Sequence, residues 1–139
     1  MFAQFAQYLP QSDGWLANWQ LFIAVTALFN TIQNFTTLKL TRKIYNNVPP
    51  TAVTALQART FAVWTLTSAM VRFYAAYNIN NKPLYDMAML TYLFAFGHFS
   101  SEFLIFRTAN FGAGLFGPAL VSTTTLVWMF KQYDFYVKA

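Results

Sequence analysis

Two long intervals without a charged residue stand out along the chain. Residues Gly14–Leu38 form 25 consecutive uncharged positions, and Thr108–Phe130 form 23 more. Charged side chains are costly in the hydrocarbon core of a bilayer, and about 20 helical residues are enough to cross it. Trp15 and Trp19 near the start of the first interval and Trp128 near the end of the second suit the membrane interfaces. The pattern therefore predicts two membrane-spanning helices, over residues 15–38 and 109–130.

Two further apolar stretches lie between these intervals. Residues 58–79 are apolar apart from Arg72, and residues 84–106 carry their charged side chains toward the two ends. The connection Asn80–Pro83 is short, so these segments are expected to form an antiparallel helical hairpin. A single re-entrant element is the alternative, but each stretch is long enough for a full span. We therefore predict an all-α integral membrane bundle of four transmembrane helices, in a single domain over residues 1–139.

The composition favours a chain that faces lipid over much of its surface. Hydrophobic residues make up 57% of the 139 positions and charged residues 9%, against about a quarter in an ordinary soluble domain. Aromatic residues reach 20%, including 16 Phe, which suits lipid-facing and interfacial positions. A soluble helical domain with a large oligomer interface is the alternative, and the low charge content argues against it.

Charge and motif content exclude several classes of function. The net charge is +5, but the nine Lys and Arg residues are scattered and form no basic stripe typical of nucleic-acid binding. The absence of cysteine excludes disulfides, thiolate catalysis and cysteine metal sites. Gly112, Gly114 and Gly117 lack the spacing of a phosphate-binding loop. We therefore expect no catalytic, cofactor-binding or metal-binding residues.

Small and polar side chains recur at helical spacing in all four segments, which is typical of faces where membrane helices pack closely. In the second span this face comprises Ala58, Ala62, Thr65, Ala69, Arg72 and Ala76. The corresponding faces are Thr26, Asn30, Gln33 and Thr37 in the first span, Ala88, Thr91, Ala95, His98 and Glu102 in the third, and Ser122 and Thr125 in the fourth. The polar and charged residues expected inside the bundle are Asn30, Gln33, Arg59, Arg72, His98 and Glu102.

His98 and Glu102 are the one arrangement with chemical promise, because an acid and a base at i and i+4 lie on one helix face. Together they are too few for an ordinary metal site. Arg59 and Glu102 are about equally far from the hairpin turn, so they are expected to form an ion pair at one depth. A structural role is therefore the favoured interpretation of His98 and Glu102. For Arg72, the expected partners are Asp86, hydroxyls or carbonyls.

The longest connection, about Lys39–Gln57, is a candidate partner-facing loop that carries Lys39, Arg42 and Lys43. On its side of the bundle the connections hold five Lys or Arg residues, against three on the other side. Positively charged loops tend to stay in the cytosol. The bias predicts a cytosolic Lys39–Gln57 loop, with both termini on the far side of the membrane.

Several blocks of residues occur in an order and spacing that resemble one protein family. In the first half they are Leu28–Gln33, Leu40–Tyr45, Leu56–Phe61 with Trp64 and Thr65, and Val71–Tyr74. In the second half they are Gly97–Glu102, Phe106–Thr108, Val121–Thr124, and Trp128 with Met129. Together these blocks resemble the ergosterol biosynthetic protein 28 family over about residues 20–130. The Phe-Arg-Thr and Ser-Thr-Thr blocks are closer to fungal members than to animal ones.

The resemblance implies a non-catalytic scaffold of sterol (ergosterol) biosynthesis, multi-pass in the endoplasmic-reticulum membrane. It implies that the chain tethers the enzymes that remove the sterol C-4 methyl groups. These are the sterol C-4 methyl oxidase, the decarboxylating C-3 sterol dehydrogenase and the 3-keto sterol reductase, with the sterol C-24 methyltransferase as a further partner in fungi. The chain itself is then expected not to be an enzyme. Whether it also forms a homodimer stays open.

Two rival functions make different demands on the sequence. An intramembrane sterol-binding protein or sterol-modifying enzyme that uses His98 and Glu102 would require a second acid/base pair at matching depth on another helix. The sequence contains no such pair. A small carrier would predict an inverted repeat between the two halves, and residues 14–79 and 84–130 share no such similarity. The scaffold is therefore the favoured hypothesis.

Overall fold

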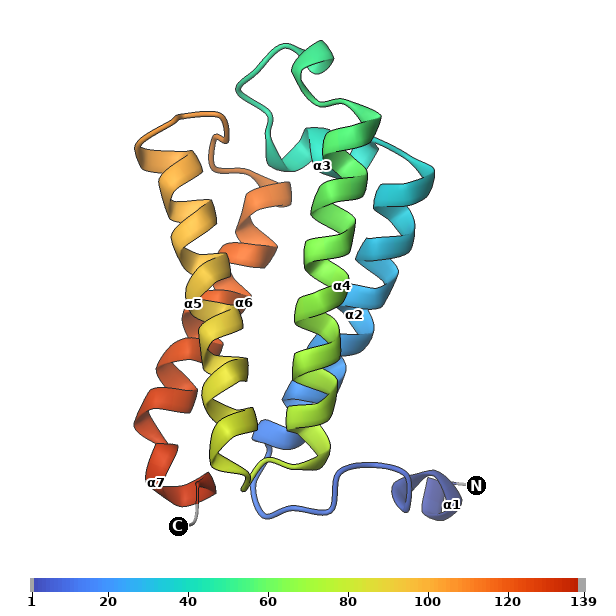
Figure 1. The fold of residues 1–139 in the computed structure, drawn as a ribbon, viewed down its shortest axis with the longest axis vertical. Coiled ribbons are helices and arrows are strands. Elements are labelled where there is room, and N and C mark those ends of the chain that lie inside the picture. The colour runs from blue at the N-terminus through green and yellow to red at the C-terminus, as the bar shows by residue number, and fades with distance from the viewer. Residues whose placement is uncertain (1, 138–139) are drawn as a thin grey trace.

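The computed structural model describes residues 2–137, and its regular elements there are all helical (Figure 1). The long helices are α2 (Leu16–Thr36), α4 (Ala55–Tyr77), α5 (Lys82–Leu104) and α6 (Ala113–Lys131). The short elements are α1 (Phe2–Ala6), α3 (Lys39–Ile44), the 3-10 helix η1 (Pro50–Ala52) and α7 (Tyr133–Tyr136). The predicted all-α class is therefore confirmed, and each long helix begins and ends within four residues of its predicted range.

The four long helices run alongside one another in a bundle (Figure 1). Helix α2 packs along α4, α5 packs along α6, and α4 contacts α5 as the expected antiparallel hairpin. Helix α3 and the two loops that follow α3 and α5 lie at one end, whereas α1 and α7 lie at the other (Figure 1). Both ends of the described chain are therefore on the same side of the bundle.

Polar side chains fix where the two central helices begin. The Thr54 hydroxyl accepts a hydrogen bond from the Gln57 backbone N–H at 3.1 Å, and the Asn81 side chain accepts one from Leu84 N–H at 3.1 Å. Each cap satisfies one of the amide groups that a helix N-terminus leaves without an intrahelical partner. Pro83 occupies the first turn of α5, where its missing N–H costs nothing.

Small residues bring α2 and α4 together. The predicted face of α4 is confirmed for five of its six residues, and the sixth, Thr65, is half-buried. The five buried residues are Ala58, Ala62, Ala69, Arg72 and Ala76. The predicted face of α2 is wrong by about one position, since Thr26 and Gln33 are exposed. The residues that α2 buries include Gln20, Ala24, Ala27, Thr31 and Asn34.

The rotation of α2 has a simple physical reason. Helix α2 turns its alanines toward α4, because small side chains allow the closest approach of two backbones. Thr26 does not have to point inward, since its hydroxyl donates to the Ile23 carbonyl of its own helix at 2.8 Å. A polar residue in an apolar helix therefore does not have to face the bundle interior when its side chain can bond to the backbone of the same helix.

Large apolar side chains cover the outside of the bundle. Phe29, Phe94 and Phe130 are 65%, 60% and 75% exposed, on α2, α5 and α6 respectively. By length and hydropathy, α6 is the one helix within residues 2–137 that passes a test for a membrane span, and 22% of its apolar window is buried. A single helix of this kind is weak support for a membrane protein, so the four-span arrangement stays a prediction.

Candidate functional site

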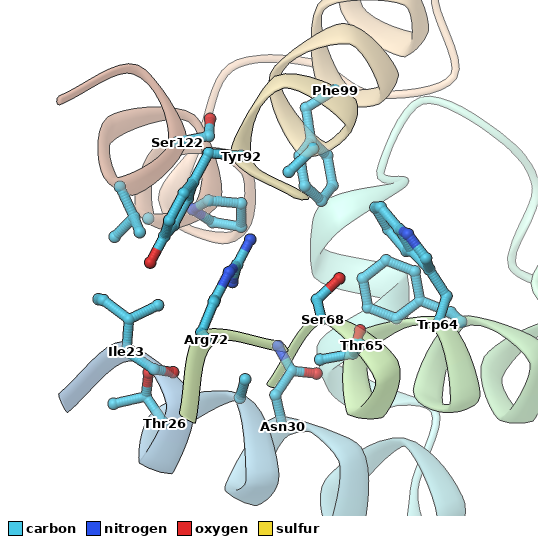
Figure 2. A pocket seen from close by; sticks show the side chains of 16 residues that line it. Ile23, Thr26, Asn30, Trp64, Thr65, Ser68, Arg72, Tyr92, Phe99 and Ser122 are labelled. Carbon is cyan, nitrogen blue, oxygen red and sulfur yellow. The ribbon is translucent and has the colours of Figure 1, made fainter. Parts of the chain in front are cut away.

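A cavity of about 230 Å³ lies in the middle of the bundle and is lined by residues of all four long helices (Figure 2). Its wall is mainly apolar, with Ile23, Phe99 and Val121 among the lining residues. Polar side chains line it from all four helices. The cavity is not sealed, because Thr26 lines it and is itself exposed. The polar lining residues are Thr26, Asn30, Thr65, Ser68, Arg72, Tyr92 and Ser122.

Arg72 is the charged residue of this cavity and is 8% exposed. Its Nε donates a hydrogen bond to the Thr91 hydroxyl at 3.1 Å, so the predicted hydroxyl partner is confirmed. Its guanidinium carbon lies 4.0 Å from the centre of the Tyr92 ring, an attractive cation–π contact. Asp86, the other predicted partner, is instead bound by Lys82 Nζ and by the Tyr133 hydroxyl, each at 2.7 Å.

A buried network beside Arg72 connects three helices. The Tyr92 hydroxyl donates to Gln20 Oε1 at 2.7 Å, and Gln20 Nε2 lies 3.1 Å from the sulfur of Met129. Nearby, Trp19 Nε1 donates to the Thr125 hydroxyl at 2.8 Å. Gln20 and Tyr92 were not among the residues predicted from the sequence. The available signal was the spacing of Gln20, Ala24 and Ala27, which places a fully buried amide on the alanine face of α2.

His98 lies toward the loop end of the bundle and does not line the central cavity, but it lines a neighbouring, more open pocket with Tyr45 and Trp64. Its Nε2 is 2.6 Å from the hydroxyl of Tyr45, and the ring of Trp64 meets it edge to face at 5.3 Å. Burial raises the pKa of Tyr45 above its ordinary value, and the negative charge of Glu102 adds to the shift. The phenol therefore stays protonated at neutral pH and is able to donate to His98. Through this contact, α5 holds the end of α3.

Glu102 also holds a loop. Its carboxylate accepts a hydrogen bond from the hydroxyl of Thr108, in the segment that connects α5 to α6. The predicted ion pair with Arg59 is wrong, because Arg59 is exposed and the one ion pair within residues 2–137 joins Lys82 to Asp86. The reason is helical register: α4 buries Ala58, and the next residue points about 100° away from it.

The structure separates the six residues that were expected inside the bundle. Arg72 is buried, and Asn30 lines the cavity while half-buried. His98 and Glu102 are half-buried near the loop end, whereas Gln33 and Arg59 are exposed. The expected interior thus divides into a central site around Arg72 and a set of contacts that hold the loops.

The two loops at this end bind each other through asparagine side chains. Asn47 donates from its side chain to the Arg107 carbonyl at 2.6 Å and from its backbone to the Thr108 carbonyl at 3.0 Å. The Asn46 side chain accepts from Asn110 N–H at 2.7 Å. Arg107 has a backbone φ of 56°, which is uncommon outside glycine. These contacts give the loop end a defined surface.

Lys39, Arg42 and Lys43 project from that surface. All three are exposed on α3, whereas Thr41 and Ile44 of the same helix are fully buried. The Thr41 hydroxyl donates to the side chain of Asn34, which fastens α3 onto the end of α2. The helix therefore presents its positive charges outward on a fixed support.

Comparisons with known proteins agree with these features over most of the chain. Residues 16–127 match the family described as Erg28 like protein. Relatives named ergosterol biosynthetic protein 28 are 44% identical in Candida albicans, with 99% of each chain covered, and 47% identical in Saccharomyces cerevisiae, with 88% of this chain and 83% of the relative covered. The human homolog is 37% identical, with 82% and 81% covered. No solved structure matches the chain. The chain therefore belongs to the Erg28-like family of ergosterol biosynthetic proteins.

Proposed function

We propose that the chain is a non-catalytic scaffold of sterol biosynthesis that spans the endoplasmic-reticulum membrane four times. The observation that carries this proposal is the use made of His98 and Glu102, the acid and base that an enzyme would need. His98 contacts Tyr45 and Glu102 contacts Thr108, so each holds a loop, and neither lines the central cavity. His98 does line a second, more open pocket with Tyr45 and Trp64, but Glu102 does not line that pocket, so the acid and the base do not share a site. The names of the relatives supply the pathway, which is ergosterol biosynthesis.

The outward faces of the long helices support membrane insertion. Each of the four carries large exposed aromatic residues, including Phe29, Phe73, Phe94 and Phe130. Soluble monomers rarely expose apolar surface on this scale, because it is costly to hydrate. The four helices contain 21, 23, 23 and 19 residues, and about 20 helical residues cross the hydrocarbon core. A bilayer would therefore cover the exposed aromatic residues along the full length of the four helices.

Two surfaces are available for partner enzymes. One is the lipid-facing aromatic surface, which suits the membrane helices of a partner. The other is the loop end, where Lys39, Arg42 and Lys43 project from α3. The partners we propose are the sterol C-4 methyl oxidase, the decarboxylating C-3 sterol dehydrogenase and the 3-keto sterol reductase, with the sterol C-24 methyltransferase as a fourth.

The physical benefit of such a tether is effective concentration. Sterol intermediates are nearly insoluble in water, and an intermediate that leaves one enzyme otherwise has to diffuse through the bilayer to the next. Holding two enzymes on one support makes the second encounter effectively intramolecular. The gain appears in the flux through successive steps and not in the rate of any single step.

Reconstitution of the three C-4 demethylation enzymes in lipid vesicles, with and without this chain, tests the proposal. We expect the chain to raise the flux through the sequence and to lower the accumulation of intermediates, while each single reaction proceeds without it. The variant His98→Gln should keep this effect if it folds, because a tether requires no proton donor. The proposal would be wrong if one of the reactions did not proceed at all without the chain and also did not proceed with a well-folded His98→Gln variant. The chain would then be an enzyme.

The three exposed charges of α3 have their own matched test. A triple Lys39→Ala, Arg42→Ala and Lys43→Ala variant should lower the recovery of the partner enzymes in a detergent pull-down if α3 is a docking surface. The control is Lys131→Ala, an exposed charge at the opposite end of the bundle. Equal recovery with both variants would leave the aromatic surface as the sole binding surface.

A further inference from the structure

Arg72 is a buried charge without an opposite charge beside it. The one ion pair within residues 2–137 is Lys82 with Asp86, and Arg72 is 8% exposed. Its Nε is bound to the Thr91 hydroxyl, but neither Nη atom has a hydrogen-bond partner in the described part of the chain. A guanidinium carries five N–H donors, and four of them are on these two atoms. The strongest donor group of the bundle is thus largely unused.

The unused donors belong to a side chain that extends into the central cavity (Figure 2). Neither Nη atom is among the buried side-chain atoms without a partner, so both reach the open space of the cavity. A charge in a mainly apolar wall is costly, so proteins rarely keep one without a counter-charge or a ligand. The Tyr92 ring covers one side of the guanidinium, which leaves the plane of its N–H groups open to a ligand. The position is therefore suited to an acceptor that arrives from outside the chain.

The residues that line the cavity beside Arg72 indicate what the other part of such a ligand is. Ile23, Phe99 and Val121 give apolar wall, and Ser68 and Asn30 add neutral polar groups near the guanidinium (Figure 2). A ligand that fits this wall has an acidic head for Arg72 and an apolar body. The volume of about 230 Å³ is slightly below the range of about 300–1,000 Å³ for small-molecule sites. Since the cavity is open at Thr26, the apolar body can extend outward.

The number of charges selects the kind of acid. Arg72 is the one Lys, Arg or His residue among the residues that line the cavity. A single guanidinium matches the single charge of a carboxylate and binds its two oxygens with two parallel N–H groups. A phosphate monoester carries nearly two charges at neutral pH and would leave about one of them without a partner. The cavity therefore favours a carboxylate over a phosphate.

We propose that the central cavity binds the carboxylate of an amphipathic acid, with the two Nη groups of Arg72 as its bidentate partner. The inference does not rest on the scaffold proposal, because it depends on the cavity and not on any partner enzyme. It gives the bundle a ligand whose head lies between the four helices and whose apolar body extends outward past Thr26. The chain could then hold a lipid acid while its outer surface binds proteins.

Photo-crosslinking in detergent tests this site with a probe of simple chemistry. The probe is decanoic acid that carries a diazirine in its chain, and the competitors are decanoate, decanol and decyl phosphate. We expect crosslinks on peptides that line the cavity, and competition by decanoate at least tenfold stronger than by decanol or decyl phosphate. Arg72→Gln should weaken the competition by decanoate about tenfold. The matched control Arg59→Gln removes an exposed arginine of the same helix and should change nothing.

Two further variants keep the proposal testable if Arg72→Gln fails to fold. Arg72→Lys keeps the charge but loses the planar pair of donors, and it should show an intermediate loss. Ala95→Leu fills part of the cavity from α5 while Arg72 stays in place, and it should lower crosslinking several-fold. Equal competition by decanoate and decanol, stronger competition by decyl phosphate, or full crosslinking in Arg72→Gln would each overturn the proposal.

Discussion

At Gly114, a single missing side chain determines how closely two helices approach. A Cβ atom at this position would lie 2.5 Å from the backbone carbonyl oxygen of Lys43, at the end of α3. Because that contact is with backbone, no side-chain rotation can relieve it. Gly97 on α5 is the opposite case, since a Cβ there would meet no atom within 4 Å.

The variant Gly114→Ala should therefore separate α3 from α6 and lower the free energy of unfolding by about 1–3 kcal/mol, as overpacking does. Gly97→Ala should leave stability unchanged or raise it by up to about 1 kcal/mol, because alanine is the better helix former. Thermal unfolding in detergent, followed by circular dichroism, measures both. Equal melting temperatures for the two variants would contradict the close approach at Gly114.

Two arginines of α4 show which positions the sequence predicts and which it does not. The assignment of Arg72 to the bundle interior followed from its place on an alanine face, and the structure buries it there. Arg59 is also an arginine and follows the fully buried Ala58, yet its side chain is exposed. Distance along a helix fixes depth well, but one position of rotation changes the direction of a side chain by about 100°. Pairing predictions across helices fail at this step.

At the scale of elements, the extents of the long helices were predictable and their contacts were less so. Charge-free intervals give helix length directly, since the cost of a buried charge acts on each residue alone. Which face of α2 is buried depends on its neighbour α4, and that information is not local. The hydrogen bonds by which Tyr45, Tyr92 and Tyr136 connect the helices were not predicted for the same reason. Each joins the tyrosine to a residue at least 53 positions away.

Helix α2 depends on α7 at its beginning. The Tyr136 hydroxyl accepts a hydrogen bond from Leu16 N–H at 3.2 Å, and the side chain is 2% exposed. Trp15, at the N-cap position, makes no side-chain cap. Gly14, with a backbone φ of +81°, makes room for the Tyr136 ring, since a Cβ there would lie 2.3 Å from the hydroxyl. The first turn of α2 is therefore capped from the other end of the chain.

Replacing Tyr136 with Phe should remove this cap and cost about 1 kcal/mol of stability. Hydrogen exchange of the Leu16 amide should accelerate, with little change in the middle of α2. The control is Tyr74→Phe, because the Tyr74 hydroxyl is exposed and has no hydrogen-bond partner within residues 2–137. Unchanged protection at Leu16 would rule out the capping role.

At the scale of the whole molecule, the bundle has a loop end and a terminal end. The loop end carries α3 with its three exposed positive charges, and the terminal end carries α1 and α7 (Figure 1). An even number of spans requires both termini on one side of the membrane, and the arrangement of the helices agrees with that requirement. The positive-inside bias then predicts a cytosolic loop end.

Single cysteines can test this orientation cleanly, because the natural chain has none. In sealed microsomes, a membrane-impermeant maleimide should label Thr51→Cys at the loop end. It should label Gln11→Cys and Asp134→Cys only after the membrane has been opened with detergent. The reverse pattern would show that the orientation is opposite but that the number of spans is still even. Labelling of one terminus and not the other would show that the number of spans is odd.

The bond between Leu16 and Tyr136 also sets an order of events during synthesis. These residues are 120 positions apart, and Tyr136 follows all four long helices in the sequence. While the ribosome is still translating, α2 can enter the membrane, but its first turn lacks the hydroxyl that completes it. The first of the four long helices to be made thus completes its first turn only after α7 has been made.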